Sequence, residues 1–219
     1  MSLSYAASVL SEFPELVSAT LTVDGIRAGA DVGPLVDPLI TRAKARLDGL
    51  SEAELPEIQA WRRAFSRMGL KPTQYRCASE ALLRRLRQDG ALPSLHPAID
   101  LCNAASAAFA IPVAVFDRDR IAGQLEVRPA DGDEAYETFQ GTTEQPYPRE
   151  IIFADAARRV HARRWTNRQS GLSAVRDTTT SVLIVAEALH DTARTDVPRL
   201  MAVLAEAITA AFPGCDCRR

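Results

Sequence analysis

An apolar segment in the middle of the chain carries polar residues that could recognise a ligand. Residues 95–121 read LHPAIDLCNAASAAFAIPVAVFDRDRI, with Asp100, Cys102 and Asn103 set among alanines. If this segment is a helix, Asp100 and Asn103 lie one turn apart on the same side. The Asn103 amide could then hydrogen-bond to the polar backbone of a ligand, or it could bond to a neighbouring loop, as buried amides commonly do. The residues alone leave both roles open. Cys102 is more typical of a small buried hydrophobic residue than of a nucleophile.

Motifs for metal or cofactor chemistry are missing from the sequence. Cys215 and Cys217 form a Cys-x-Cys pair, but the three histidines lie far apart, whereas zinc ligands usually show paired spacing. The chain has no Gly-x-Ser-x-Gly nucleophile elbow, which α/β-hydrolases require. It also has no glycine-rich phosphate loop of the nucleotide-binding types. We expect no metal and no cofactor.

Arginine clusters accompany both tryptophans and one predicted helix. The planar guanidinium of arginine suits bidentate contact with phosphate. The alternative is a solvated face paired with the many acidic residues. The candidate RNA-binding residues are Arg62, Arg84, Arg164 and Arg168.

The composition is that of an ordinary globular protein. Of 219 residues, 47% are hydrophobic and 25% are charged, with a net charge of −2. Such a chain has no global attraction to nucleic acid or membranes, so any RNA footprint must be local, and we expect no DNA or membrane partner. No apolar run is long enough to span a bilayer, the start lacks a secretory pattern, and the four cysteines form no disulfide framework. We expect a reduced, cytoplasmic protein.

Helical patterns dominate the first half of the chain. We predict a strand over 17–26, followed by helices over 33–49, 51–69 and 77–90. Ser51 and Glu54 have capping-box spacing at the start of the second helix.

Short β-rich runs follow, separated by Gly, Pro and Asp turns. They cover residues 112–117, 124–130, 134–139, 150–155 and 158–165. Residues 178–189 could form a strand or a buried helix, and their Thr, Val and Ile content favours a strand. A helix over 196–212, with Asp196 as N-cap and Pro198 near its first position, closes the chain. This order predicts an α+β fold in a single domain over residues 1–219.

Five segments, read in order, resemble a known family. They are AWRRAFSRMGLKPTQYRCASEALLRRL, LPSLHPAIDLCNAASAAFAIPVAVFDRDRI, GDEAYETFQG, RRWTNRQS and DTTTSVLIVAEAL. Together they are similar to the B3/B4 domain of the bacterial phenylalanyl-tRNA synthetase β chain in its free-standing form, over about residues 13–189. The resemblance implies a three-layer α+β fold with an unusual β-sandwich flanked by helices. It also implies an editing role, because in the synthetase this domain hydrolyses tyrosine wrongly attached to the phenylalanine tRNA.

The resemblance also assigns residues to a substrate pocket. The family's Thr-Asn pair corresponds to Cys102 and Asn103, and its histidine to Ala114. The family's acidic selector falls near 184–185, where nothing acidic stands; Glu187 lies close by and matches the free-standing pattern. An alkyl side chain at that position cannot hydrogen-bond to the hydroxyl of tyrosine and so cannot select tyrosine. The pocket residues implied are Cys102, Ala114, Arg149, Gln169 and Thr179, with Arg149 standing where the family usually has glycine, so that it would narrow the pocket or change its charge.

Two glutamates, Glu80 and Glu150, are candidates for acid–base chemistry because they stand at positions that match the family resemblance. A positioned carboxylate can orient a water molecule for attack on an ester, and it can equally pair with an arginine of the scaffold. The candidate catalytic residues are therefore Asn103, Glu80 and Glu150, with Cys102 in a pocket wall.

The resulting hypothesis is an editing-type domain that binds the aminoacyl end of tRNA and hydrolyses a mischarged aminoacyl-tRNA in trans. A non-catalytic tRNA- or RNA-binding module is one alternative, favoured by the loss of the histidine and the acidic selector. A protein that binds a small, amino-acid-like molecule is another. The retained Asn103 favours a working pocket. The amino acid, the tRNA and the oligomeric state stay open.

Overall fold

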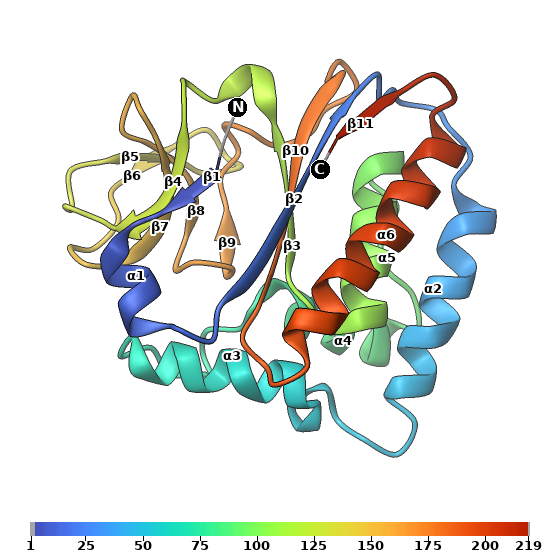
Figure 1. The fold of residues 1–219 in the computed structure, drawn as a ribbon, viewed down its shortest axis with the longest axis horizontal. Coiled ribbons are helices and arrows are strands. Elements are labelled where there is room, and N and C mark those ends of the chain that lie inside the picture. Colours follow the sequence, from blue (N-terminus) through green and yellow to red (C-terminus); the bar gives the residue numbers. More distant parts are fainter. Residues whose placement is uncertain (1–2, 219) are drawn as a thin grey trace.

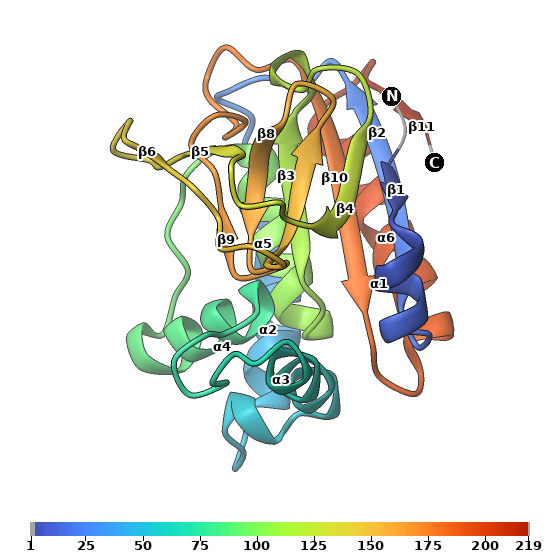
Figure 2. The same cartoon turned by 90° about the vertical axis from the view of Figure 1, so that its left-hand side faces the viewer.

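The computed structural model of the chain describes residues 3–218. Two β-sheets pack face to face, and three helices cover the outer face of one of them (Figure 1). Two further helices, α3 and α4, lie across one end of the sheets (Figure 2). The chain therefore forms the three-layer α+β arrangement that the sequence predicts.

Sheet B, the central layer, has four strands in antiparallel order. They are β11 (Asp216–Arg218), β2 (Val17–Asp24), β10 (Ser181–Ala188) and β3 (Val113–Asp117). Residues 182–188 of β10 are all buried, because helices cover one face of the sheet and sheet A covers the other. This explains why β10 is apolar at nearly every position from 182 to 188, with Glu187 as the exception, rather than alternating.

Sheet A, the outer layer, follows the order β1-β4-β7-β8-β5-β6, with β9 paired to β8. Its strands are β1 (Leu3–Tyr5), β4 (Leu125–Pro129), β5 (Ala135–Glu137), β6 (Thr143–Glu144), β7 (Ile151–Asp155), β8 (Arg159–Arg163) and β9 (Arg168–Gln169). Most pairs are antiparallel, and β1–β4 and β5–β8 are parallel. The five short β-rich runs predicted from the sequence each form one of the strands β3, β4, β5, β7 and β8.

The helical layer consists of α2 (Gly33–Arg46), α5 (Pro97–Phe109) and α6 (Ala193–Ala211). Helix α5 lies innermost and contacts α2, α6 and β3. Its alanines at 104, 105 and 108 are completely buried, because a residue without a bulky side chain lets neighbouring elements approach closely. These helices and sheet B enclose the first hydrophobic core.

A second core lies between the sheets and is closed by α1 (Ala7–Glu12), α3 (Pro56–Arg67) and α4 (Ala78–Asp89). Trp165 stands at its centre and makes edge-to-face contacts with Trp61 and Phe13, at centroid distances of 5.0 and 4.9 Å. Such aromatic pairs add about 1 kcal/mol each beyond the area they bury. This cluster ties the helical end of the molecule to the turn that follows β8.

Two predicted helix starts differ from the structure. The capping box is present, with Glu54 accepting from the Ser51 N–H at 2.8 Å, but it caps the short 3₁₀ turn η1 (Glu52–Glu54), and α3 begins at Pro56. Helix α6 begins at Ala193 instead of after Asp196. The Asp196 carboxylate accepts from the Thr192 hydroxyl, and its N–H bonds to the Thr192 carbonyl at 3.0 Å, so one more turn forms before it.

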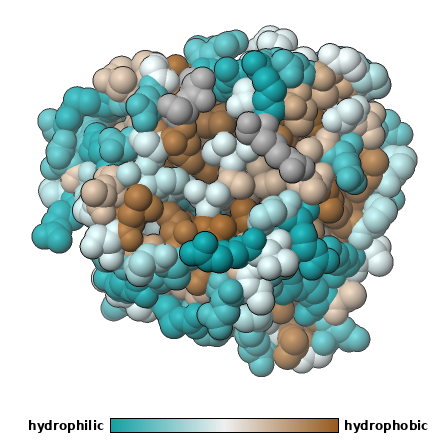
Figure 3. Space-filling model, viewed as in Figure 1, coloured by the Kyte–Doolittle hydropathy of each residue, from teal (hydrophilic) through white to brown (hydrophobic). Residues whose placement is uncertain are grey.

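The face of the molecule drawn in Figure 3 carries both hydrophobic and hydrophilic side chains. On the face shown in Figure 3, small hydrophobic patches are separated by hydrophilic residues. The second 3₁₀ turn, η2 (Arg118–Arg120), connects sheet B to sheet A. Among the residues described, none of the helices has the length and apolar character needed to cross a membrane.

Candidate active site

A cavity of about 180 Å³ opens between the two sheets, beside the start of α4. Sheet B contributes Val113, Ala114 and Glu187, and sheet A contributes Phe153 and Ala162. The remaining walls come from Ala78, Pro112 and the run Trp165, Thr166, Asn167, Arg168 and Gln169. The walls are thus largely apolar, with polar groups gathered on one side, as is typical of a ligand pocket.

Strand β10 aims one carboxyl group into this cavity. Leu183, Val185 and Leu189 belong to the core between the sheets, whereas residues 182, 184 and 186 face the helices. The twofold alternation of a strand therefore turns Glu187 toward the cavity.

The environment of Glu187 changes its acidity. Its side chain is only 2% exposed, and its Oε1 accepts hydrogen bonds from the Tyr5 hydroxyl and the Trp165 Nε1–H, each at 2.8 Å. Burial raises the pKa of the Glu187 carboxyl from 4.5 to about 7, although the two donors act to lower it. Both hydrogen bonds end on Oε1, which leaves Oε2 to carry a proton or face a ligand. Near neutral pH this carboxyl can both accept and donate a proton.

Other polar groups line the same cavity. The Gln169 Nε2–H donates to the Val115 carbonyl at 2.7 Å, which fixes the amide against β3. The Thr166 Oγ1 is buried without a hydrogen-bond partner among the described residues. Arg168 pairs with Glu144 at 3.1 Å. The unpartnered hydroxyl is available to a ligand, because a buried polar group normally has a partner.

Three of the residues predicted from the sequence line this cavity, namely Ala114, Arg168 and Gln169. Asn103 lines a different groove, between α2 and the loop over residues 90–94, together with Asp100. Cys102 is buried, and burial raises the pKa of its thiol to about 12. The structure therefore does not bring Asn103 to the cavity that holds Glu187.

The other predicted pocket residues lie elsewhere. Arg149 and Glu150 line a third cavity with Arg164, at the start of β7 beside the loop that follows α3. Thr179 is buried and donates to the Asp117 carboxylate at 2.7 Å. This bond anchors the loop before β10 to the end of β3.

Glu80 and Glu150, the predicted catalytic carboxylates, are engaged in ion pairs. Glu80 is fully buried, with its Oε1 2.5 Å from Nη2 of Arg62. Glu150 accepts from Nε and Nη2 of Arg163 at 2.9 and 3.0 Å. Although burial of Glu150 acts to raise its pKa, the bonds to Arg163 hold that pKa below 4.5. Both glutamates thus stabilise the scaffold.

Among the predicted RNA-binding arginines, one differs from the rest. Arg62, Arg84 and Arg168 each lie within 4 Å of a carboxylate. Arg164 has no such partner among the described residues, and its guanidinium stacks on the Tyr75 ring, 4.8 Å from the centroid.

A Ser-His-Asp arrangement also occurs, which the sequence order did not suggest. His161 Nδ1 lies 2.8 Å from the Ser173 hydroxyl, and its Nε2 lies 3.2 Å from Asp155 Oδ2. All three side chains are buried; Asp155 borders a shallow surface cavity, but His161 and Ser173 line none of the described cavities. Asp155 is further held by Arg159 at 2.7 Å. A substrate cannot reach Ser173, so this network is part of the packing of sheet A.

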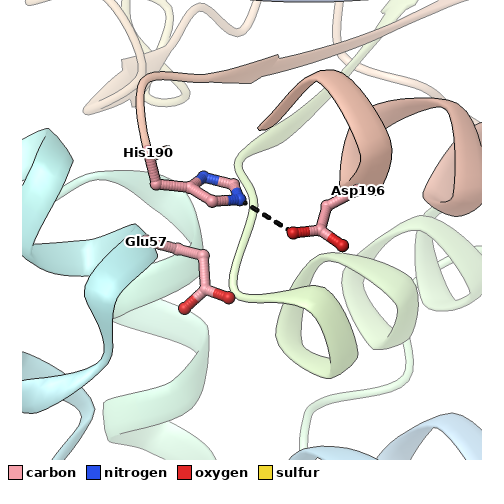
Figure 4. A group of neighbouring side chains, drawn as sticks. All are labelled: Glu57, His190 and Asp196. Atoms are coloured by element: carbon pink, nitrogen blue, oxygen red, sulfur yellow. Dashed lines mark hydrogen bonds and ion pairs between the residues drawn. The ribbon is translucent and has the colours of Figure 1, made fainter. Parts of the chain in front are cut away.

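Glu57, His190 and Asp196 form the second notable cluster (Figure 4). The imidazole Nε2 lies 3.1 Å from the Asp196 carboxylate. These are metal-ligating residue types, but Arg46 donates to both oxygens of Glu57 at 2.7 Å. A guanidinium already occupies the carboxylate that a cation would need, so the cluster is better described as an ion-pair network.

The unusual position of the Glu187 carboxyl could be inferred from the sequence. It is the single charged residue in the run 182–189, and a lone carboxyl inside a buried strand is rare unless it is paired or functional. Thr166 had no comparable signal, because a hydroxyl without a partner is visible only in three dimensions.

The chain has an α+β fold with a cavity between two sheets. A model of the B3/4 domain family matches residues 60–201, and the chain therefore belongs to the B3/4 domain family. An N-terminal fragment of the phenylalanyl-tRNA synthetase β-subunit from Pyrococcus horikoshii has the same fold, with a TM-score of 0.55 and 12% sequence identity. The match covers 99% of this chain and 50% of that one. The comparison with curated proteins gives no match.

Proposed function

We propose that the chain binds the aminoacyl end of a tRNA in the cavity beside Glu187 and hydrolyses the ester of a mischarged aminoacyl-tRNA. The observation that carries this proposal is a buried carboxyl with a pKa of about 7 in a largely apolar cavity. Membership of the B3/4 family supports a tRNA-related role.

The size of the cavity fits part of such a substrate. At about 180 Å³ it is smaller than the roughly 300–1,000 Å³ of pockets that enclose a drug-sized ligand. It therefore suits an amino-acid side chain and its ester carbonyl, with the nucleotide outside. Apolar walls from Val113, Phe153 and Ala162 favour an apolar or aromatic side chain.

The ester hydrolysis needs one proton acceptor near the carbonyl carbon. Ionised Glu187 takes a proton from a water molecule as the water oxygen attacks that carbon. The tetrahedral intermediate then collapses, the bond from carbon to the ribose oxygen breaks, and Glu187 returns the proton to that oxygen. The products are a free amino acid and a ribose hydroxyl, and the step itself needs no cofactor. A base of pKa near 7 suits this task, because it is available and still effective at neutral pH.

The test is deacylation of a panel of tRNAs charged with correct and incorrect amino acids. Hydrolysis of one mischarged species by the wild type, with a rate that rises through pH 7, would support the proposal. Glu187→Gln should lower the rate about 100-fold or more. The matched change Glu206→Gln, on the exposed side of α6, and Asn103→Ala, outside the cavity, should leave the rate unchanged.

Each other outcome has a clear meaning. A rate lost in Asn103→Ala but kept in Glu187→Gln would move the active site to the groove beside α2. If no charged tRNA is hydrolysed, the proposed enzyme function is wrong. Salt-sensitive tRNA binding would then indicate a non-catalytic binding module.

A further inference from the structure

A second surface, at the start of β7 beside the loop that follows α3, combines aromatic rings with positive charges. This groove has a volume of about 370 Å³, and five of its lining residues carry the argument: Lys71, Tyr75, Tyr147, Arg149 and Arg164. We call it the two-tyrosine groove. Tyr147 is 70% exposed, although a large ring of this kind usually finds apolar cover.

Across residues 3–218, the side chains of the groove cations lack a close ion-pair partner, although the positive charge of Arg164 helps to lower the pKa of Glu150. Most arginines elsewhere in the chain lie in ion pairs, but Lys71, Arg149 and Arg164 form none within the described residues. The acidic residue that lines the groove, Glu150, is neutralised by Arg163. The groove thus carries net positive charge on a chain whose total charge is −2.

Two of these cations stand at strained backbone positions. Arg149 has φ 69° and Arg164 has φ 47°, which is the left-handed region. A non-glycine residue there costs about 1–2 kcal/mol, and glycine would adopt it freely. Backbone strain that is retained at a cationic residue suggests that its positive charge serves a function.

The groove adjoins the candidate active site. One segment contributes Tyr75 to the groove and Ala78 to the cavity, and another contributes Arg164 to the groove and Trp165 to the cavity. The Asn167 Nδ2–H donates to the Arg76 carbonyl at 2.7 Å and so joins the two segments. A chain whose end lies in the cavity can therefore leave it across the two-tyrosine groove.

We propose that the two-tyrosine groove binds the unpaired terminal nucleotides of an RNA, whose end enters the cavity beside Glu187. A nucleobase stacks on the exposed ring of Tyr147, while Lys71 and Arg149 contact phosphates. Aromatic platforms beside positive charge are the usual means of binding single-stranded nucleic acid. The proposal rests on the proposed function for the identity of the RNA, but the binding can be tested without it.

The test uses a fluorescein-labelled single-stranded RNA with the sequence of a tRNA acceptor 3′ strand. Binding is followed by fluorescence anisotropy over a series of salt concentrations. Tyr147→Ala should weaken binding about tenfold, since stacking of one base is worth about 1–3 kcal/mol. The control is Phe139→Ala, which removes an equally exposed ring (66%) at the end of β5.

A second variant tests the charge without threatening the fold. Arg149→Gly removes a cation and relieves the left-handed strain, so it should fold at least as well as the wild type. It should weaken RNA binding and make the slope of log K against log salt shallower by about 0.7, the value for one phosphate contact on a single strand. Arg194→Gln, an exposed arginine of α6 without an ion pair in the described part of the chain, should change neither.

Several results would overturn the proposal. Equal binding by Tyr147→Ala and the wild type would do so, as would equal losses in Phe139→Ala or Arg194→Gln. Tyr147-dependent binding of poly-glutamate, with none of RNA, would assign the groove to an acidic protein. If the wild type deacylates tRNA and Tyr147→Ala binds RNA as tightly as the wild type does, only the groove proposal fails. If RNA binding depends on Tyr147 but no charged tRNA is hydrolysed, only the proposed function fails.

Discussion

Replacement of Glu187 by glutamine should stabilise the folded chain at alkaline pH while it removes the proposed proton acceptor. Burial raises the pKa of this carboxyl from 4.5 to about 7, and a tenfold change in an ionisation equilibrium corresponds to about 1.4 kcal/mol. The difference between the pKa of Glu187 in the folded chain and its ordinary value therefore corresponds to about 3 kcal/mol in the free energy of unfolding. The folded chain binds the proton more tightly, so this stability is fully present below about pH 4.5 and is lost as the pH rises through 7.

Glutamine isolates this effect because it keeps the shape of the side chain. Its Oε1 can still accept from Tyr5 and Trp165, and it carries no charge to bury. The free energy of unfolding of Glu187→Gln should be close to that of the wild type at pH 4.5 and exceed it by about 3 kcal/mol at pH 8. The contributions of other carboxyls are the same in both proteins and cancel in the difference.

Urea unfolding followed by tryptophan fluorescence measures the difference directly. Both tryptophans, Trp61 and Trp165, are buried and report on the core between the sheets. The exposed change Glu206→Gln should give a difference near zero at every pH. A difference between Glu187→Gln and the wild type that does not vary from pH 4.5 to 8 would refute the reasoning, because Glu187 would then ionise normally in the fold.

Two further predictions concern groups that serve the scaffold. Glu80→Gln should lower the free energy of unfolding by about 3 kcal/mol, because it leaves the Arg62 guanidinium beside a neutral amide; a urea midpoint equal to that of the wild type would contradict this. The thiols of Cys77 and Cys102 should react slowly with Ellman's reagent in the native protein and quickly in urea, because burial raises the pKa of each to about 12. Fast reaction of either thiol in the native protein would count against the described packing.

Local sequence patterns predicted those elements whose ends and composition agree. The Thr, Val and Ile content of 178–189 gave strand β10, and Gly90 ends α4 in the left-handed conformation, with φ 75°. Helix α6 was placed too late because Asp196 and Pro198 are both typical of a helix start. In the structure Asp196 instead hydrogen-bonds to Thr192 and His190, which lie just before it in the sequence, and the helix begins one turn earlier.

Of the residues that the resemblance assigned to a site, Ala114, Arg168 and Gln169 line the cavity beside Glu187. Arg168 and Gln169 reach the cavity directly after the turn that follows β8, and Ala114 lies on the strand that borders it. The resemblance assigned Asn103 to the same pocket, and a helix so rich in alanine gives no independent indication of which side meets the sheet. In the fold, Ala104 and Ala108 belong to the core beside sheet B, and Asn103 lines the groove on the α2 side.

Two residues that lower the stability of the fold lie beside the surfaces proposed for function. Glu187 is a carboxyl that would be more stable as an amide, and Arg149 occupies a backbone conformation that suits glycine. Substitutions that stabilise a protein commonly weaken its activity where the original residue serves a function. The cavity and the two-tyrosine groove share their bordering segments. The two destabilising residues, Glu187 and Arg149, therefore belong to adjoining surfaces. We therefore expect Glu187→Gln and Arg149→Gly to raise stability together, while the first removes hydrolysis and the second weakens RNA binding.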